Sequence, residues 1–241
     1  MTVIKAVLTG HSRGLGAAIA ADLLARKIPL LALARHATAD REGMQQVILD
    51  LSDTAALAAW LSGDALRRFM ADADCVLLIN NAGTVQPVGA IPTHAPAAVA
   101  QAISLNVTAA LMLAGAVAAA GAGERRVLHV SSGAGRNAYP GWAVYCASKA
   151  ALDQHARAAA LDQVAGLRIC SLAPGVIDTD MQAEIRASDV RQFPLRQRFE
   201  ALKRDGALSS PEDCARRLVA YALAPGFGDA PVADLRDIGH A

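Results

Sequence analysis

Apolar and polar positions follow each other along this chain in two kinds of block. Short runs rich in Val, Ile and Leu are typical of strands that are buried on both faces of a parallel sheet. Longer stretches, in which apolar residues recur three and four positions apart, predict helices that cover a core. The predicted strands are residues 2–9, 28–34, 46–49, 75–79, 126–130, 167–172 and 232–238, and the predicted helices are 17–27, 55–69, 97–120, 142–164 and 211–223. Strands and helices therefore alternate along the sequence.

This alternation predicts an α/β fold. Successive strands joined by helices pair in parallel with right-handed crossovers, so helices cover both faces of the sheet. The 241 residues contain no internal repeat and no linker-like segment, which favours one domain. Ligands of such sheets bind outside the carboxyl ends of the strands. The residues that follow predicted strands, and that we expect to converge there, are Gly10, Arg35, Asp50, Asn80, Ser132 and Pro174.

Two segments depart from the general pattern. Residues 95–123 carry no charged side chain and are long enough to span a bilayer. Ala is the commonest residue among them, and polar residues such as Gln101 and Asn106 interrupt the run, so we expect a buried helix of a globular protein. Residues 180–208 have more charge and weaker periodicity, with Pro194 and Gly206 as breakers, which indicates a mobile lid over a binding site.

A glycine-rich loop joins the first predicted strand to the first predicted helix. Its sequence, from Thr9, is Thr-Gly-His-Ser-Arg-Gly-Leu-Gly, which places glycines at positions 10, 14 and 16. Glycines in this context let the backbone approach a pyrophosphate, and the helix N-terminus offers free N–H groups to it. The spacing differs from the common Gly-x-Gly-x-x-Gly pattern, and a simple tight turn is the alternative interpretation.

The end of the second predicted strand bears on the choice of cofactor. An acidic residue near this point usually binds the ribose 2′-hydroxyl of NAD. Here the strand ends at Ala34 and Arg35, and Arg13 lies in the glycine-rich loop. Two guanidinium groups suit a 2′-phosphate, although solvated surface arginines are the alternative. We therefore predict NADP(H) as the preferred cofactor and NAD(H) as the second choice.

Tyr145 and Lys149 are the candidate catalytic pair. They lie four residues apart in a predicted helix, so their side chains project from the same face. An ammonium near a phenol is expected to lower the pKa of the tyrosine, which can then exchange a proton with a carbonyl or alcohol. An ordinary amphipathic pair is the alternative. Asn106, inside an apolar helix, needs a partner for its amide: either a bond back to the helix or a kink that holds a water.

Composition and charge narrow the functional classes. The formal net charge is +1 without a basic block, which argues against nucleic acid or an anionic membrane as partner. Neither the four cysteines nor the six histidines have metal-ligand spacing, so we expect no metal site, and scattered cysteines fit reduced thiols in a cytoplasm. The chain runs from Met1 directly into a predicted strand, which leaves no room for a signal peptide.

Taken together, these motifs resemble the short-chain dehydrogenase/reductase family across nearly the whole chain. The matching segments are Thr9–Gly16 (TGHSRGLG), Asp50–Leu51, Asn80–Gly83 (NNAG), Asn106, Ser132, Tyr145–Lys149 (YCASK) and Pro174–Thr179. The resemblance implies a single Rossmann-type, doubly wound parallel sheet of about seven strands, with helices on both faces. Residues 1–241 would then form one NAD(P)-binding domain with the substrate lid at residues 180–208.

The resemblance also implies roles for four residues. Tyr145 would protonate the carbonyl oxygen as general acid, and Lys149 would bind the ribose of the nicotinamide nucleotide and depress the tyrosine pKa. Ser132 would hydrogen-bond the substrate oxygen, and Asn106 would hold a water that links Lys149 to solvent. Ser131 fits the serine position less well, because Ser132 lies at the family's distance before the tyrosine.

The implied cofactor site draws on several parts of the chain. They are the glycine-rich loop (Gly10, Ser12, Arg13, Gly14, Leu15, Gly16), Arg35, Asp50 and Leu51 beside the adenine, Asn81, Ala82 and Gly83 beside the adjoining ribose, the pair Tyr145 and Lys149, and the loop residues Pro174, Gly175, Val176 and Thr179, the last of which would meet the carboxamide end.

These roles predict an NADPH-dependent oxidoreductase of the carbonyl reductase type, which transfers hydride between the nicotinamide and a small carbonyl or alcohol. Two alternatives stay open: an NAD-linked alcohol dehydrogenase on the same site, and a non-catalytic protein that senses NADP(H). The C-terminal segment, residues 229–238, lacks the family's Gly-rich ending and resembles the sepiapterin reductase and benzil reductase branch. We expect a cytoplasmic homodimer, with a tetramer as the alternative, and no nucleic-acid or membrane partner.

Overall fold

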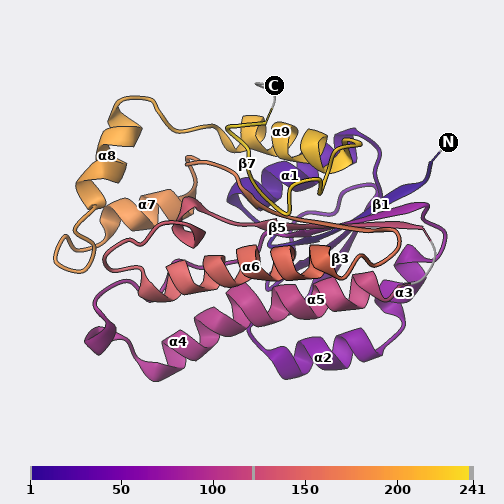
Figure 1. Ribbon diagram of the computed structural model, residues 1–241, viewed down its shortest axis with the longest axis horizontal. Helices are drawn as coiled ribbons and strands as arrows, with labels where there is room; N and C mark the ends of the chain where they lie inside the picture. Colours follow the sequence, from indigo (N-terminus) through magenta and orange to yellow (C-terminus); the bar gives the residue numbers. More distant parts are fainter. Residues whose placement is uncertain (1, 121–122, 239–241) are drawn as a thin grey trace.

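The structure, a computed structural model, describes residues 2–120 and 123–238 and is built on one parallel sheet (Figure 1). The strands are β1 (Ile4–Thr9), β2 (Leu30–Ala34), β3 (Met44–Ile48), β4 (Cys75–Asn80), β5 (Glu124–Val130), β6 (Leu167–Ala173) and β7 (Val232–Asp234). Their order is β3-β2-β1-β4-β5-β6-β7, and every neighbouring pair is parallel. The predicted doubly wound sheet of seven strands is confirmed. The order reverses direction between β1 and β4, and ligands of such sheets bind at that crevice.

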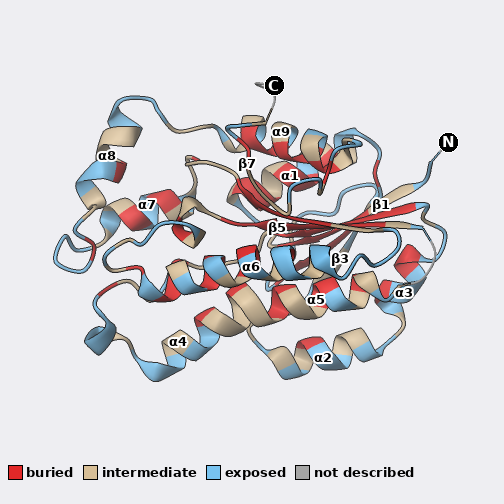
Figure 2. Ribbon diagram, viewed as in Figure 1, coloured by how far each residue is buried: buried red, intermediate tan, exposed pale blue. Residues whose placement is uncertain are grey.

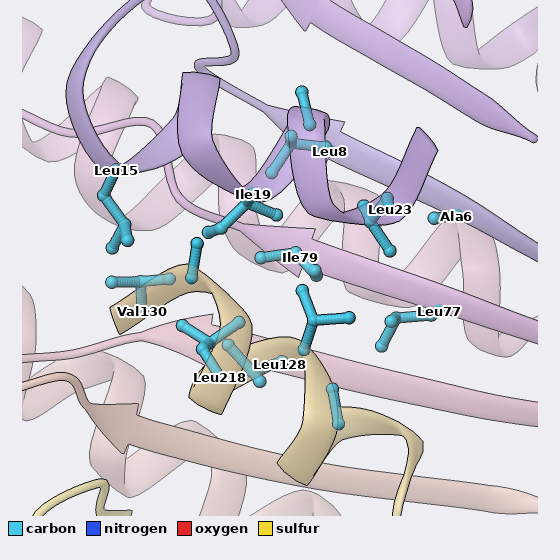
Figure 3. Packing of buried hydrophobic residues seen from close by; sticks show 14 of the residues in the cluster. Ala6, Leu8, Leu15, Ile19, Leu23, Leu77, Ile79, Leu128, Val130 and Leu218 are labelled. Atoms are coloured by element: carbon cyan, nitrogen blue, oxygen red, sulfur yellow. The ribbon is translucent and has the colours of Figure 1, made fainter. Parts of the chain in front are cut away.

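Two groups of helices cover the sheet (Figure 1). α1 (Gly14–Ala25) and α9 (Pro211–Leu223) lie on one face, and α2 (Thr54–Ser62), α3 (Ala65–Met70), α5 (Ala109–Ala118) and α6 (Ala143–Leu161) lie on the other. Alternate residues of each strand point to opposite faces, so Leu8 packs on the α1 side and Val7 on the α5 side. Figure 3 shows Leu8 packed near Ile19 of α1, and Leu128 near Leu218 of α9. Both faces of the central strands are therefore buried.

Most element boundaries agree with the predictions, and the differences have local causes. The predicted helix 55–69 is two helices, because Gly63 ends α2 and Asp64 begins α3. The last strand ends at Asp234 and does not continue to residue 238. There the Asp234 carboxylate accepts a hydrogen bond of 3.0 Å from the backbone N–H of Arg236, which turns the chain.

The long uncharged segment is one continuous helix with an irregular turn in its middle. It consists of α4 (Pro96–Ile103), a π-helical turn η2 (Ser104–Thr108) and α5. By length and composition it is the one helix within residues 2–120 and 123–238 that could cross a membrane, and 33% of its most apolar window is buried. Core helices of globular proteins pass the same test, and α5 packs Leu113 and Val117 against the sheet. Packing against the sheet therefore accounts for part of its apolar composition.

The predicted lid is more regular than its sequence indicates. It contains α7 (Asp180–Ala187) and α8 (Arg196–Arg204), which stand apart from the sheet at one end of the molecule (Figure 1). Figure 2 shows exposed residues on the outer side of α8 and along the loop between the two helices. Ile185, Phe193 and Phe199 are buried on the inner side. That this segment moves as a lid stays a prediction.

Candidate active site

A cavity of about 340 Å³ opens at the carboxyl ends of β1, β4, β5 and β6. Most of the predicted site residues line it: Gly10, Ser12, Arg13, Gly14, Leu15, Gly16, Arg35, Asn81, Ala82, Gly83, Ser132, Tyr145, Lys149, Pro174, Gly175, Val176 and Thr179. Asp50, Leu51 and Asn106 are not in this lining. The topology thus brings residues from six parts of the sequence to one place. Of the six residues expected to converge at the strand ends, Gly10, Arg35, Ser132 and Pro174 line the cavity, whereas Asp50 and Asn80 do not.

Tyr145 and Lys149 lie in the first turns of α6, above the end of β5. The Lys149 Nζ lies 5.6 Å from the centroid of the Tyr145 ring and donates a 2.7 Å hydrogen bond to the Val130 carbonyl. Ser132 follows β5 in an extended conformation, and its Oγ accepts a 3.1 Å bond from the Ala134 N–H. The Ser132 hydroxyl also hydrogen-bonds the Tyr145 phenol. Serine and phenol therefore form one polar pair on the cavity wall.

Burial has the largest effect on the pKa values of Tyr145 and Lys149. It raises the pKa of Tyr145 to about 12, against the opposing effect of the Ser132 hydrogen bond. Burial likewise lowers the pKa of Lys149 to about 8, and the negative charge of Asp153 opposes that change. The expectation that Lys149 brings the tyrosine pKa toward neutral pH is therefore wrong for this structure. The phenol is neutral and protonated at neutral pH, which suits a proton donor.

Asn106 occupies the π-helical turn, where it is 2% exposed. Its Oδ1 accepts a 2.8 Å bond from the Thr84 N–H, and its Nδ2 donates a 2.9 Å bond to the Thr84 carbonyl. The amide thus fixes the loop after β4 and makes no bond back to its own helix. The helix has a π turn at Asn106, whereas the predicted kink and the role of Asn106 in holding a water stay predictions.

The glycine-rich loop packs tightly enough to expose its backbone to the cavity. A Cβ on Gly16 would lie 1.9 Å from the Gly10 carbonyl oxygen, so only glycine fits there. The N-cap residue of α1, Arg13, forms no side-chain cap, which leaves N–H groups free at the helix N-terminus. The Asn81 side chain donates 3.1 Å bonds to the Thr9 and Gly10 carbonyls and so supports the loop from β4.

Arg13 and Arg35 line the cavity, whereas Asp50 and Leu51 do not. Arg13 and Arg35 are exposed and both line the cavity, with Arg13 3.8 Å from Asp180 of the lid. Asp50 instead accepts two bonds from Ser52, at 2.9 and 2.7 Å, and Leu51 is buried in the core. The predicted contact of Asp50 and Leu51 with an adenine stays a prediction.

Sequence reasoning missed a polar link beneath the arginines. His11, 3% exposed, lies 3.1 Å from the Gln46 Oε1 of β3. The same oxygen accepts a 2.8 Å bond from the Thr38 N–H, in the loop that follows Arg35. This network ties that loop to the glycine-rich loop. Nothing in the local pattern reveals it, because the partners are 35 residues apart.

An aromatic cluster forms one side of the cavity. The chain has four Phe, two Trp and three Tyr, and five of them gather here: Tyr139, Trp142, Tyr145, Phe193 and Phe199. Trp142 stacks on Phe193 with ring centroids 4.6 Å apart and meets Tyr145 edge-on at 5.4 Å. The sequence leaves the role of Met181 and Phe193 open; Met181 lines the cavity, and Phe193 is fully buried behind Trp142. Tyr139, Trp142 and Tyr145 are spaced three residues apart in a chain with 4% aromatic content. This spacing is the signal that could have indicated Trp142 as a residue of the site.

The C-terminal segment, which departs from the usual family ending, contributes to the same cavity. Asp234 and Arg236 both belong to the lining, and the Arg236 Nη2 lies 2.7 Å from the Asp234 Oδ2. A Cβ on Gly175 would contact the Arg236 side chain at 3.7 Å, so this tail packs on the loop after β6. The unusual ending therefore forms part of the wall of the cavity.

Comparison with known proteins gives consistent relationships. Residues 5–190 match the family model of short chain dehydrogenases. The chain is 32% identical over 242 residues to a benzil reductase ((S)-benzoin forming) of Bacillus subtilis, with 96% of this chain and 98% of that protein covered. It is 32% identical over 259 residues to the sepiapterin reductase of Mus musculus, with 96% of each covered. A crystal structure of a short-chain dehydrogenase/reductase from Burkholderia vietnamiensis has 46% identity, a TM-score of 0.71 and 98% coverage of both chains.

The fold, the site geometry and these matches agree with one another. The family match extends from β1 into the lid and includes Ser132, Tyr145 and Lys149. The two relatives, in turn, are matched over 96% of this chain and over 98% and 96% of their own lengths. The chain belongs to the short-chain dehydrogenase family of oxidoreductases.

Proposed function

We propose that this protein is an NADPH-dependent carbonyl reductase. The observation that carries the proposal is the buried Tyr145 phenol, which is protonated, hydrogen-bonded to Ser132 and lies on an open cavity. A neutral phenol beside a hydroxyl matches what a carbonyl oxygen needs during reduction: a hydrogen bond that fixes it and a proton that neutralises it.

The chain's own residues account for the proton in this reaction. Ser132 and Tyr145 together hold the substrate oxygen, and the phenol gives its proton to that oxygen as negative charge develops there. The Lys149 ammonium, one helical turn from Tyr145, stabilises the phenolate that results. Trp142 and Phe199, on the substrate side, exclude water from the reacting oxygen.

A nicotinamide cofactor fits the other half of the cavity. Family members use such cofactors, which supply the hydride when bound. The tightly packed glycines and the uncapped N-terminus of α1 suit a pyrophosphate. Arg13 and Arg35 on the same lining, with Ala34 and not an acid at the end of β2, favour a 2′-phosphate and therefore NADPH. We assign Lys149 and Thr179 to the nicotinamide nucleotide, because both line the same cavity.

The substrate that we propose is a small aromatic ketone or α-diketone. The lining opposite the glycine-rich loop is mainly apolar and aromatic, with Val85, Trp142 and Phe199 among its residues. Such walls suit a flat, uncharged molecule. Benzil, the substrate in the name of the Bacillus subtilis relative, is an aromatic α-diketone, and we extend this substrate class to the present chain.

The direct test is NADPH consumption over a carbonyl panel of benzil, an aromatic monoketone, an aliphatic ketone and sepiapterin. We expect benzil or the aromatic monoketone to be reduced fastest, with NADPH preferred to NADH. Consumption of NADH in preference to NADPH would favour the NAD-linked alcohol dehydrogenase. Tight NADPH binding without turnover of any carbonyl would favour a protein that only senses the cofactor.

A pair of variants tests the preference for NADPH over NADH. Arg35→Ala removes a charge that we assign to the 2′-phosphate, so NADPH binding should weaken about tenfold or more while NADH binding stays unchanged. Arg41→Ala, an exposed arginine in the segment between β2 and β3, is the matched control. Equal NADPH affinity in both variants would refute the assignment.

We also propose that the protein is a cytoplasmic homodimer. The four cysteines are free thiols, and the helix Pro96–Ala118 combines an apolar sequence with only 33% burial of its most apolar window. An apolar helix face of this kind suits a subunit contact. Light scattering after size exclusion should give twice the 24.9 kDa mass of the chain.

A further inference from the structure

One buried acid near the active site is not used by the proposed reaction. Asp153 lies in α6, one turn beyond Lys149, and is 1% exposed. Its Oδ1 accepts hydrogen bonds from the Ser131 hydroxyl at 2.6 Å and from the Ser171 hydroxyl at 2.7 Å. Its Oδ2 accepts a 3.2 Å bond from the Arg136 Nε. Donors from three other segments satisfy this buried carboxylate, so the fold fixes its position.

These bonds hold the end of β5 at two successive residues. Lys149 binds the Val130 carbonyl at 2.7 Å, and Asp153 binds the Ser131 hydroxyl at 2.6 Å. The two side chains are four residues apart on α6 and therefore lie on the same face. Ser132, the next residue of the chain, is the one that hydrogen-bonds Tyr145. The two-point attachment thus sets the distance between the catalytic serine and the helix that carries the tyrosine.

Arg136 extends the network to the cavity wall. Its Nη2 donates a 2.8 Å bond to the Ala233 carbonyl of β7, and its Nη1 lies 3.8 Å from the Asp234 carboxylate. A Cβ on Gly135 would lie 3.0 Å from the Asp153 Oδ2 and 3.0 Å from the Lys149 carbonyl, so the turn η3 (Gly133–Gly135) packs directly on α6. The network therefore joins β5, β6, β7 and η3 to α6.

The negative charge of Asp153 also affects the protonation of Lys149. Asp153 on α6 and His129 on β5 interact electrostatically with Lys149, whose Nζ lies 5.6 Å from the Tyr145 ring. Arg136 contacts Asp153, and Asp234 on β7 in turn contacts Arg136. Tyr145 is neutral at neutral pH, and burial lowers the pKa of His129 to about 3, so this imidazole is neutral too. Asp153 is then the negative charge that favours the ammonium form of Lys149 against burial.

We propose that Asp153 is a positioning residue of the reductase site: its carboxylate fixes Ser131, and hence Ser132, against α6 and keeps Lys149 in its charged form. This inference rests on the proposed function for its catalytic meaning. The electrostatic part can be measured without any substrate, however, so its failure and that of the proposed function are distinguishable.

The chain is well suited to a direct measurement, because it contains only four lysines: Lys5, Lys27, Lys149 and Lys203. NMR of ¹³C-labelled lysine side chains follows the titration of each ammonium, and Lys149→Arg identifies the Lys149 signal. We expect Lys149 to titrate lowest of the four in the wild-type protein. In Asp153→Asn its titration should move down by about one pH unit, because the nearby negative charge is lost.

Two further variants separate charge from general disruption. Ser171→Ala removes one hydrogen bond of Asp153 but keeps the carboxylate, so the Lys149 titration should stay near the wild-type value. Arg136→Gln removes the positive partner, and the Lys149 titration should move up, opposite to Asp153→Asn. Arg136 is 27% exposed at its side chain, so this variant keeps the test available if Asp153→Asn does not fold.

The direction in which the Lys149 titration moves decides whether the proposal stands. Downward movement in Asp153→Asn, or upward movement in Arg136→Gln when the first variant does not fold, supports the proposal. An unchanged or raised Lys149 titration in folded Asp153→Asn, or an unchanged or lowered one in Arg136→Gln, overturns it. With benzil as substrate, Asp153→Asn should also move the alkaline limb of the kcat profile to lower pH, whereas KM for NADPH should change little.

Discussion

The two sides of the substrate cavity are built by different means. We call residues 129–153, from the end of β5 into α6, the reaction wall, and residues 180–208 the lid. The reaction wall buries polar groups that are paired with one another: Ser131 with Asp153, Ser132 with Tyr145, and Lys149 with the Val130 carbonyl. Every one of these groups has its position fixed by a partner from another segment.

The ion pairs of the lid lie closer to solvent than the paired groups of the reaction wall. Its ion pairs are mostly exposed, as between Arg196 and Glu200, whose side chains are 34% and 42% exposed. Surface pairs of this kind contribute little to stability. The inner side of the lid is anchored by Ile185, Phe193 and Phe199. Under the proposed function, the paired groups of the wall carry out the chemistry, and the lid selects the substrate.

The largest expected difference between the two sides comes from a matched pair of serine variants. Ser132→Ala removes a hydrogen bond to the reacting oxygen, so kcat with benzil should fall about 100-fold or more. Ser188→Ala removes a lid hydroxyl that bonds the Glu184 carbonyl at 3.2 Å, and kcat should remain within about twofold of wild type. Steady-state kinetics of both variants checks this. Comparable losses in the two would remove the distinction between wall and lid.

A smaller effect concerns the stability of the wall in acid. His129 is fully buried, between the Asn80 Nδ2 and the His155 Nδ1, each at 3.1 Å, and its pKa is lowered to about 3. The unfolded chain therefore binds this proton more readily, and the stability contributed by the neutral imidazole is present above about pH 6.5 and lost as pH falls toward 3. Between pH 7 and 5 the loss is about 2 kcal/mol.

Urea unfolding at these two pH values measures the effect. His129→Gln keeps an amide for hydrogen bonding but cannot titrate, so its free energy of unfolding should fall less between pH 7 and 5 than that of the wild type. If both proteins lose the same amount of stability, the neutral buried imidazole is not the source.

The smallest expected effect is in the lid. Phe199→Leu keeps an apolar side chain but weakens the contact with Trp142, whose ring centroid is 5.4 Å away. KM for benzil should rise about fivefold, corresponding to about 1 kcal/mol, with little change in kcat. Protease cleavage within residues 180–208 should become faster as the lid opens more often. A fall in kcat with KM unchanged would place Phe199 in the reaction wall instead.

Local spacing made much of the fold and site predictable. Buried strands read as continuous apolar runs, and the glycines at 10, 14 and 16 fall where strand becomes helix. Tyr145 and Lys149 share a helical face whatever surrounds them, and parallel strands place their carboxyl ends together. These features depend on period and topology, which the sequence carries directly.

Other features depend on tertiary contacts that no local pattern contains. Asp153 meets Ser171 across 18 positions, and Trp142 meets Phe199 only after the lid has folded back. The proximity of Lys149 in sequence predicts a lowered pKa for Tyr145, whereas burial raises this pKa. The sequence does not indicate the lid helices α7 and α8, because their apolar residues are few and lie among many charged ones.

The most direct test of Tyr145 as the proton donor compares two tyrosines of the same cavity. Tyr145→Phe removes the proposed proton donor, and Tyr139→Phe removes a hydroxyl that also belongs to the lining. With NADPH and benzil, we predict that kcat falls about 10²- to 10⁴-fold in Tyr145→Phe, while NADPH affinity and the activity of Tyr139→Phe stay near wild type. Wild-type activity in Tyr145→Phe, or an equal loss in both variants, would contradict the central claim that Tyr145 delivers the proton.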